Sequence, residues 1–359
     1  MKRIDFMKTN ISTKIIQIAE KYHEICKGCN ICTKGCILLK DYVKHPKEFL
    51  KSLYEEKNID NKLPYYCFSC NVCKNLCPSE VDFNKLFMEA KKEISRGKKS
   101  PHKKHFIIRN HQRLSSSKIF STVKGKSAVG FMPGCSLSSF DPELVTKIHE
   151  LLKNKYQNLS LILKCCGNPS YSIGEMERFN RMYSSLKFSL EKNGIEHVIT
   201  ACQSCYKTIK ENSPNLKVTS LWEELKSFNL PKLNTKDEFF IFDSCSADEN
   251  AKKSIREIAK KLNIKIENNE VVRNSKCCGL GGCVHAINSD IFKSNLKKHE
   301  ENIKSEKVLT YCAGCRDALS NVKDAFHILE LIFNSDNLKP KAPTKTSKAW
   351  LNRLKLKAR

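Results

Sequence analysis

Nineteen cysteines set the chemistry open to this chain of 359 residues. Eight of them stand in two runs with the spacing C-x2-C-x2-C-x3-C, and Pro78 follows the second run. The runs are formed by Cys26, Cys29, Cys32 and Cys36 and by Cys67, Cys70, Cys73 and Cys77. Three cysteines spaced by two residues can wrap a loop around one cube of iron and sulfide, while the fourth cysteine reaches a neighbouring cube. The two runs therefore predict two cubane 4Fe-4S clusters.

The fourth cysteine of each run is expected to serve the cluster of the other run. The two predicted ligand sets are Cys26, Cys29, Cys32 and Cys77 for one cluster and Cys67, Cys70, Cys73 and Cys36 for the other. Zinc is the alternative metal, but a zinc site needs only two C-x2-C pairs and leaves the third evenly spaced cysteine without a role. Ile37 stands after the first run in place of the proline that follows the second, which removes no ligand.

Ten further cysteines form two copies of one five-cysteine pattern in the rest of the chain. The copies contain Cys135, Cys165, Cys166, Cys202 and Cys205 and then Cys245, Cys277, Cys278, Cys312 and Cys315. Glycine follows each Cys-Cys pair, so the backbone there can pass close to inorganic sulfide. The step from Cys135 to Cys245 is 110 positions and that from Cys166 to Cys278 is 112. This nearly constant offset indicates an internal duplication.

With these motifs the chain resembles the cysteine-rich, CCG-domain iron–sulfur proteins. That family includes the catalytic subunit of heterodisulfide reductase and the iron–sulfur subunits of glycolate oxidase and anaerobic glycerol-3-phosphate dehydrogenase. The resemblance covers nearly the whole chain, and the part from Cys26 to Pro78 looks like the ferredoxin module that is fused to or paired with these domains.

The resemblance implies that each five-cysteine copy binds a noncubane 4Fe-4S cluster and that the two clusters face each other across a substrate disulfide. The ten cysteines of the two copies would then hold the catalytic site. The chain departs from the family pattern at Ser244, where many relatives have proline, and it adds Cys283. Cys283 is expected to be a bystander, with a role facing the substrate as the alternative. His285 is expected to be an ordinary surface or core histidine.

The elements that position the first eight cysteines are expected to be helices. Helical periodicity over 11–25, 38–56 and 82–94 predicts a small helical domain with two clusters in residues 1–95. Residues 96–126 are rich in Lys, Arg, His and Ser, and we expect a basic linker there, with an exposed basic flank as the alternative.

The repeated cysteines are expected to follow β-strands. Strand-like and helical segments alternate through two α/β modules, residues 127–233 and 234–338. The expected strands are 128–132, 159–163, 197–200, 239–242 and 308–310, and the expected helices are 143–154, 175–193, 249–262 and 289–305. The carboxyl ends of neighbouring strands would bring the five thiols of a module to one edge of a sheet. The fold class is therefore α+β multidomain: a helical two-cluster ferredoxin domain followed by two duplicated α/β cysteine-rich modules.

The chain closes with a basic tail, residues 339–359, that we expect to be solvated and disordered. Trp350, Leu351 and Leu354 could share one face of a short helix, so contact with an acidic partner or a membrane surface is the alternative.

Composition is that of an ordinary globular protein, with 40% apolar and 28% charged residues. Neither a stretch of ~20 apolar residues nor the apolar core of a secretion signal stands in the sequence, so we expect a cytoplasmic protein, with peripheral attachment to the inner face of the membrane as the alternative. A reducing cytosol and the odd cysteine count argue against a disulfide scaffold. The formal charge of +26 shrinks if bound clusters add negative charge.

The leading hypothesis is an oxidoreductase component of anaerobic metabolism. Its cubane clusters would carry electrons between a flavoprotein dehydrogenase or reductase subunit and the paired noncubane site, where a disulfide or quinone-like acceptor is reduced. A docking subunit without chemistry of its own and a dithiol protein using Cys202-x-x-Cys205 and Cys312-x-x-Cys315 stay as alternatives. A nucleic-acid-binding protein with structural metal is the third, but no binding module is recognised, so no nucleic acid is expected as a partner.

Overall fold

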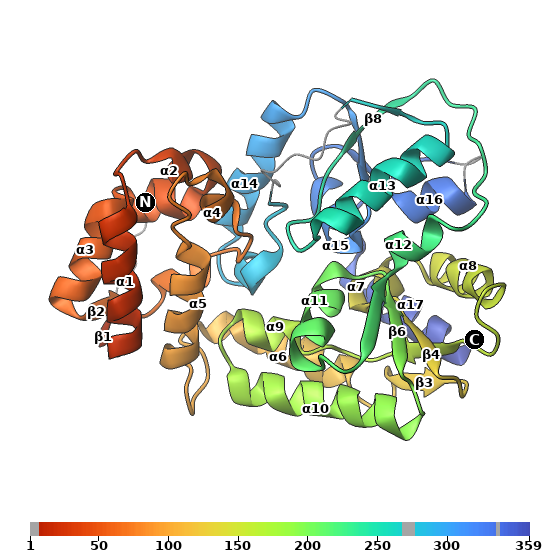
Figure 1. Cartoon of the computed structure of the whole chain (residues 1–359), viewed down its shortest axis with the longest axis horizontal. Coiled ribbons are helices and arrows are strands. Elements are labelled where there is room, and N and C mark those ends of the chain that lie inside the picture. Colours follow the sequence, from red (N-terminus) through yellow and green to blue (C-terminus); the bar gives the residue numbers. More distant parts are fainter. Residues whose placement is uncertain (1–6, 268–276, 335–337) are drawn as a thin grey trace. The chain divides into compact units, whose positions relative to one another are not determined.

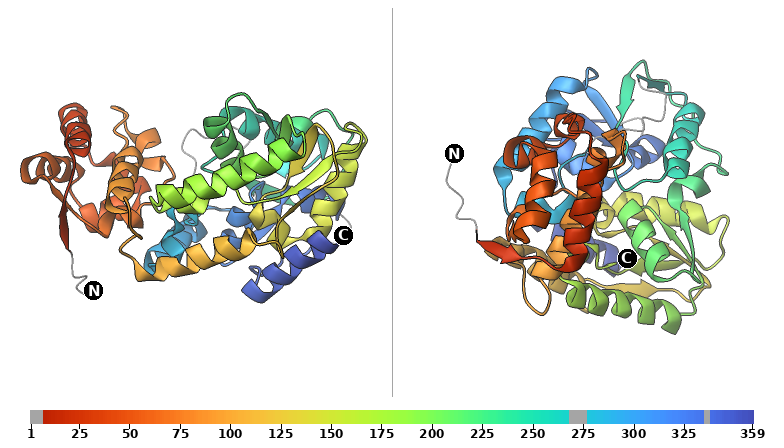
Figure 2. Two further views of the ribbon diagram at one scale, coloured as in Figure 1. Left: turned by 90° about the horizontal axis from the view of Figure 1, so that it is seen from below. Right: turned by 60° about the vertical axis from the view of Figure 1, so that its left-hand side comes forward.

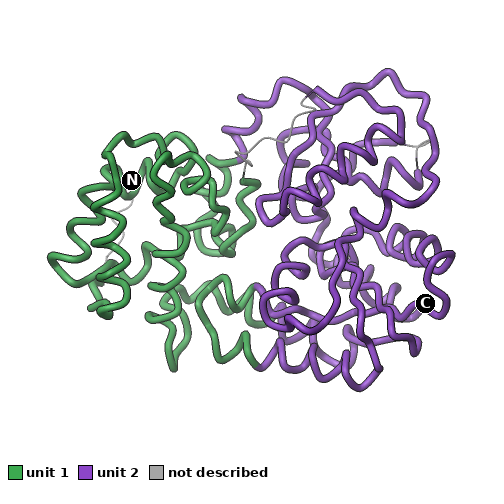
Figure 3. Tube along the Cα trace, viewed as in Figure 1, with its two compact units in different colours: residues 1–110, 169–180, 273–295 green, residues 111–168, 181–272, 296–359 purple. Residues whose placement is uncertain are grey.

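The computed structural model describes residues 7–267, 277–334 and 338–359. The chain forms two compact units (Figure 1, Figure 3). Unit 1 is made of residues 1–110, 169–180 and 273–295, and unit 2 of residues 111–168, 181–272 and 296–359. Unit 1 therefore combines the amino-terminal part of the chain with one stretch from each cysteine-rich repeat.

Unit 1 consists of short helices around one apolar core (Figure 2). α1 (Thr13–Ile25) packs against α3 (Pro46–Glu56) and α5 (Phe83–Ile94). α5 begins where the Asp82 side chain accepts a hydrogen bond from the Lys85 amide, a typical N-cap. The other elements are the antiparallel pair β1 (Lys8–Asn10) and β2 (Asn58–Asp60), and α2 (Ile31–Gly35), η1 (Leu38–Val43), η2 (Leu63–Tyr66), α4 (Val72–Leu76), η3 (Lys103–His105), α9 (Asn168–Ser172) and η4 (Gly281–Ala286).

The helix expected over residues 38–56 is interrupted. η1 is a π-helical segment that ends at Val43, and α3 begins at Pro46. Proline suits the first turn of a helix because its missing N–H would have no partner there, and it disfavours a helical conformation in the preceding His45. The single expected helix is therefore two.

Two sheets form the framework of unit 2 (Figure 1). The first has the strand order β3-β5-β4-β6-β7, in which β3 runs antiparallel to β5 and the other neighbours are parallel. The second sheet is parallel and has the order β11-β10-β8-β9. The strands are β3 (Thr122–Lys124), β4 (Val129–Met132), β5 (Ser160–Leu163), β6 (His197–Thr200), β7 (Lys217–Ser220), β8 (Glu238–Ile241), β9 (Lys265–Ile266), β10 (Lys307–Thr310) and β11 (Asp324–His327).

One apolar core joins both sheets of unit 2. Trp222, from the first repeat, is fully buried and contacts the rings of Tyr311 and His327 from the second repeat, at centroid distances of 5.9 and 5.8 Å. The helices that follow the strands are α7 (Cys135–Phe140), α8 (Pro142–Lys153), α10 (Met176–Lys192), α11 (Gln203–Asn212), α12 (Leu221–Leu225), α13 (Glu249–Lys261), α14 (Ser289–Asn302), α15 (Ala313–Leu319) and α16 (Ile328–Phe333). The expected fold class, a helical ferredoxin domain followed by two α/β modules, is confirmed.

The expectation of a linker in residues 96–126 is wrong. α6 (Phe106–Ser115) and β3 lie within this stretch, and His105 and Gln112 are buried. The Gln112 side chain donates a hydrogen bond to the Gly167 carbonyl. Buried polar side chains hide this helix from a search for apolar periodicity.

The expectation of a disordered tail is also wrong. α17 (Thr346–Ala358) packs against α7 and α8. Leu351 and Leu354 are exposed, whereas Arg353 and Leu356 are buried, so the helix turns a different face inward from the one expected. Within the described parts of the chain, no helix combines the length and the hydropathy needed to cross a membrane.

Candidate iron–sulfur sites

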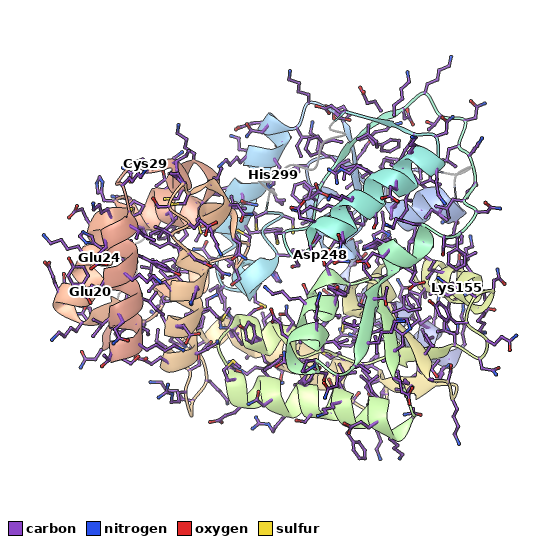
Figure 4. All side chains as sticks on the ribbon, in the orientation of Figure 1. Glu20, Glu24, Cys29, Lys155, Asp248 and His299 are labelled. Carbon is purple, nitrogen blue, oxygen red and sulfur yellow. The ribbon has the colours of Figure 1, made fainter. Side chains whose placement is uncertain are left out.

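The four thiols predicted for the first cubane cluster line one hollow in unit 1. They are Cys26, Cys29, Cys32 and Cys77. Cys26 caps the carboxyl end of α1, and Gly28 and Asn30 turn the chain back with positive φ angles. Burial, together with the charges of the neighbouring Cys26 and Cys77 thiols, raises the pKa of the Cys32 thiol to about 11. Cys29 is exposed, which leaves one side of this group at the surface (Figure 4).

The other four thiols of the two runs lie together as well. Burial raises the pKa of Cys36, and Cys70 and Cys67 raise it further because their charges lie close by. The pKa of Cys73 is raised by burial and then by Cys36. The structure thus groups the fourth cysteine of each run with the other run, as predicted.

A close approach of two helices produces this crossing. Gly35 ends α2 beside α4, and a Cβ atom there would lie 2.4 Å from a methyl carbon of Leu76 and 2.8 Å from one of Val72. Glycine therefore lets α2 contact α4 and carries Cys36 across to the second run.

The donor sets suit a cluster of several irons. The first set lines its hollow without His, Asp or Glu, and in the second set the Asp82 carboxylate lies near the Cys73 thiol. A cube binds one thiolate at each iron, whereas zinc gathers its ligands around one point. In the described residues, no three His, Cys, Asp or Glu side chains converge on a position for a single metal ion. Four cysteine thiolates form the donor set of one 4Fe-4S cube, and the ligand assignment stays a prediction.

Lys91 is a buried cation beside the second thiol set that the sequence analysis missed. Its side chain is fully buried, and its Nζ donates to the carbonyl oxygens of Cys67 and Ser172, each at 3.2 Å. Burial lowers the pKa of Lys91, and the Cys67 and Cys283 thiols act in the opposite direction. Because Lys91 lies one turn beyond Phe87 on the buried face of α5, helical periodicity could have identified it.

A segment from the second cysteine-rich repeat packs on the second run within unit 1. A Cβ atom at Gly281 would lie 2.0 Å from the Phe68 carbonyl oxygen, and one at Gly282 would lie 2.1 Å from that of Cys67. A hydrogen bond with the thiol of Cys277 lowers the pKa of Cys70. The structure therefore brings a thiol of the second repeat into contact with a thiol of the second run.

Cys283 follows these glycines and is buried with a φ of 57°. Burial raises the pKa of its thiol to about 11, so the group is protonated at neutral pH. His285 is exposed, and its ring meets the edge of Phe292 at a centroid distance of 6.2 Å.

The five thiols of the first repeat gather at one sheet edge in unit 2. Each group follows the carboxyl end of one of three adjacent parallel strands, β5, β4 and β6. A hydrogen bond with Cys165 lowers the pKa of Cys135 to about 6, and one with Cys205 lowers the pKa of Cys166. Gly134 completes the group, because a Cβ atom there would lie 2.6 Å from that of Cys202. This is the arrangement expected from the alternation of strands and helices.

The second repeat is divided between the units. Cys245 follows β8, and Cys312 and Cys315 follow the neighbouring strand β10, all in unit 2. A hydrogen bond with Cys315 lowers the pKa of Cys312 to about 6. Cys277 and Cys278 belong to unit 1. The complete second ligand set therefore stays a prediction.

Arg353 was also missed by the sequence analysis, because it lies in the tail. This arginine of α17 places Nη2 3.9 Å from the Cys135 Sγ atom. Arg353 and Lys164 line one small hollow with Cys135. The tail's single tryptophan, Trp350, was the signal that the tail packs on the protein.

Comparisons with known proteins match these motifs. The family model of the 4Fe-4S dicluster domain matches residues 25–82, and that of the cysteine-rich domain matches residues 129–210 and 239–320. One subunit of the fumarate reductase (CoM/CoB) of Methanothermobacter marburgensis is 22% identical, over 86% of this chain and 71% of its own length.

Two uncharacterized iron–sulfur proteins are also similar. The one from Methanocaldococcus jannaschii is 25% identical over 72% of this chain, and the one from Methanococcus maripaludis is 22% identical over 80%. The chain spans less than two thirds of their lengths, 58% and 63%. The matched domains follow one another as one dicluster domain and then two cysteine-rich domains, and they contain the thiol groups described above. The chain is an iron–sulfur oxidoreductase component that joins a 4Fe-4S dicluster domain to two cysteine-rich domains and is homologous to that fumarate reductase (CoM/CoB) protein.

Proposed function

We propose that this chain carries electrons from a flavoprotein subunit through two cubane clusters to the cysteine-rich modules, where a disulfide is reduced. The contact between Cys70 and Cys277 carries this proposal, because it joins the second thiol set of the dicluster domain to a predicted ligand of the second cysteine-rich module. When bound, the clusters supply one-electron transfer.

The burial of the thiols supports a direction for the path. Cys29 is exposed, so the first thiol set offers a surface that a redox partner can reach. Cys67, Cys73 and Cys277 are buried, which keeps the later part of the path away from solvent and from oxidants dissolved in it. We infer that electrons arrive at the Cys29 end and leave through the Cys70–Cys277 contact.

The proposed reaction is the reduction of a small disulfide at the paired modules. Two electrons, delivered one at a time, and two protons convert the disulfide into two thiols. The chain is similar to one subunit of a fumarate reductase (CoM/CoB), which supports the proposal that it acts within a multisubunit complex. The flavoprotein partner and the cytoplasmic location are parts of the proposal.

Iron and sulfide counts on the protein reconstituted without oxygen test the proposal. We expect about sixteen irons per chain, and signals of two cubane and two noncubane clusters in electron paramagnetic resonance. Cys277→Ser should lose about four irons, whereas the matched control Cys283→Ser should keep the full number because Cys283 lies outside the four predicted ligand sets. About eight irons in the parent protein would show that the cysteine-rich modules hold no clusters and would overturn the proposal.

A further inference from the structure

The C-terminal helix α17 lies beyond both matched domains, whose last match ends at residue 320. It is nevertheless fixed to the first cysteine-rich module. The Asn352 side chain donates to the carbonyl oxygens of Ser139 and Phe140, at 2.8 and 3.2 Å, and so satisfies the end of α7. Because α7 begins at Cys135, α17 holds a defined position relative to that thiol.

The guanidinium group of Arg353 is held in place by aromatic rings. It lies over the ring of Trp350, 5.1 Å from the centroid. Trp350 in turn contacts Phe120 at 4.6 Å and His111 at 4.9 Å. This stacking directs Arg353 toward Cys135 and leaves the side chain 6% exposed.

The positive charge of Arg353 is buried without a carboxylate to balance it. Among the described residues no Asp or Glu forms an ion pair with Arg353, and its Nη1 atom has no hydrogen-bond partner. The buried Arg256 of the same unit shows the usual solution, since it donates to both carboxylate oxygens of Asp243 at 2.6 and 2.8 Å. The Cys135 sulfur lies near Nη2, and the buried Nη1 still lacks an acceptor, so Arg353 calls for a further anionic group beside Cys135.

We propose that Arg353 donates a hydrogen bond to a sulfur of the cluster bound at the first cysteine-rich module and raises its reduction potential. This inference rests on the proposed function, because it requires a cluster at Cys135. Adding an electron makes the cluster more negative, and a fixed cation with a free N–H stabilises that reduced form. Arg353 thus acts directly on the cluster, without contacting the substrate.

Potentiometric titration of the whole reconstituted chain, followed by electron paramagnetic resonance, tests the inference. A Cys312→Ser background removes the second noncubane signal, so the first can be followed alone. Arg353→Gln should lower the midpoint potential, with roughly a tenfold change in the oxidised-to-reduced ratio at a fixed potential, or about 59 mV for one electron. Lys355→Gln is the matched control, because it removes the same charge from an exposed site on α17 and should leave the potential unchanged.

The outcomes separate the two proposals. If the parent protein binds no iron at the first module, the proposed function fails. If iron binds and Arg353→Gln titrates like the parent, only the role of Arg353 fails. If Arg353→Gln and Arg353→Met both fail to fold, Arg353→Lys decides the matter: it should fold and show a smaller decrease, because one ammonium replaces the two-nitrogen fork. A potential equal to that of the parent would then overturn the inference.

Discussion

Two buried cations mark the sites where we place clusters. Lys91 lies beside Cys67 in unit 1, and Arg353 lies beside Cys135 in unit 2. Neither forms an ion pair with a carboxylate among the described residues. Charged groups are rarely buried unless an opposite charge compensates them, and a cluster with four thiolates is negatively charged. Both side chains therefore support the presence of anionic centres at the neighbouring thiols.

Gly282 offers a sharp test of the packing beside Cys67. Its φ is 62°, and a Cβ atom would lie 2.1 Å from the Cys67 carbonyl oxygen. Gly97 is the matched control, since its φ is 66° and a Cβ atom there would meet nothing within 4 Å. We expect Gly97→Ala to cost about 1 kcal/mol of unfolding free energy and Gly282→Ala roughly 3 kcal/mol or more.

Urea unfolding of both variants, with an iron count, measures this difference. Gly282→Ala should also lose iron from the second run, because the Cys67 loop must move. Equal stability of the two variants would show that the Gly282 segment does not pack on that loop.

The helices and strands with regular apolar patterns are the ones that the sequence predicts correctly. The strand expected at 197–200 is β6, and the helix expected at 249–262 is α13 with one residue fewer at its end. α6 and α17 were missed because polar side chains form most of their buried faces. Asn352 is buried through hydrogen bonds to Ser139 and Phe140, more than two hundred residues earlier in the chain, and no local pattern encodes such a partner.

Cys77 is predicted to serve the cluster of the first run, and Cys36 that of the second. This assignment predicts which pairs of cysteine variants lose the same cluster. Cys26→Ser and Cys77→Ser should each lose about four irons, and their double variant should also lose about four, because both residues serve one cluster. Cys26→Ser combined with Cys36→Ser should lose about eight. An iron count on the four reconstituted proteins decides the matter, and a loss of about eight from the Cys26 and Cys77 pair would contradict the crossing.

In the molecule as a whole, sequence identified the thiol groups better than the units that contain them. Spacing alone grouped the eight cysteines of the runs, and strand order grouped the five of the first repeat. The division into units depends on contacts between distant segments, such as Gly282 on the Cys67 loop. Such contacts depend on shape complementarity between surfaces that are far apart in the chain, and one sequence does not display it.

Each unit contains a buried histidine that should make the chain sensitive to acid. Burial, together with the nearby positive groups His102 and Arg316, lowers the pKa of His105 in unit 1 and of His327 in unit 2 to about 3. In the unfolded chain these groups bind protons near pH 6.5, so stability is lost as the pH falls below that value. Each histidine should cost about 1 kcal/mol between pH 7.5 and 5.5.

Unfolding followed separately for each unit at the two pH values checks this sign. His327→Asn should reduce the loss in unit 2, because asparagine can still accept the hydrogen bond from the Leu329 amide at the start of α16 but does not titrate. An unchanged pH dependence in that variant would show that His327 is not responsible.

The three stretches of unit 1 have a consequence for how the cell makes this protein. The ribosome releases the two cysteine runs first, yet their packing partners at Gly281 and Gly282 emerge only after most of the chain has been synthesised. Until then the Cys67 loop lacks its cover, and its thiols are open to oxygen and to stray metals. We therefore expect iron and sulfide to be inserted at the cysteine runs after the polypeptide is complete, and not during translation.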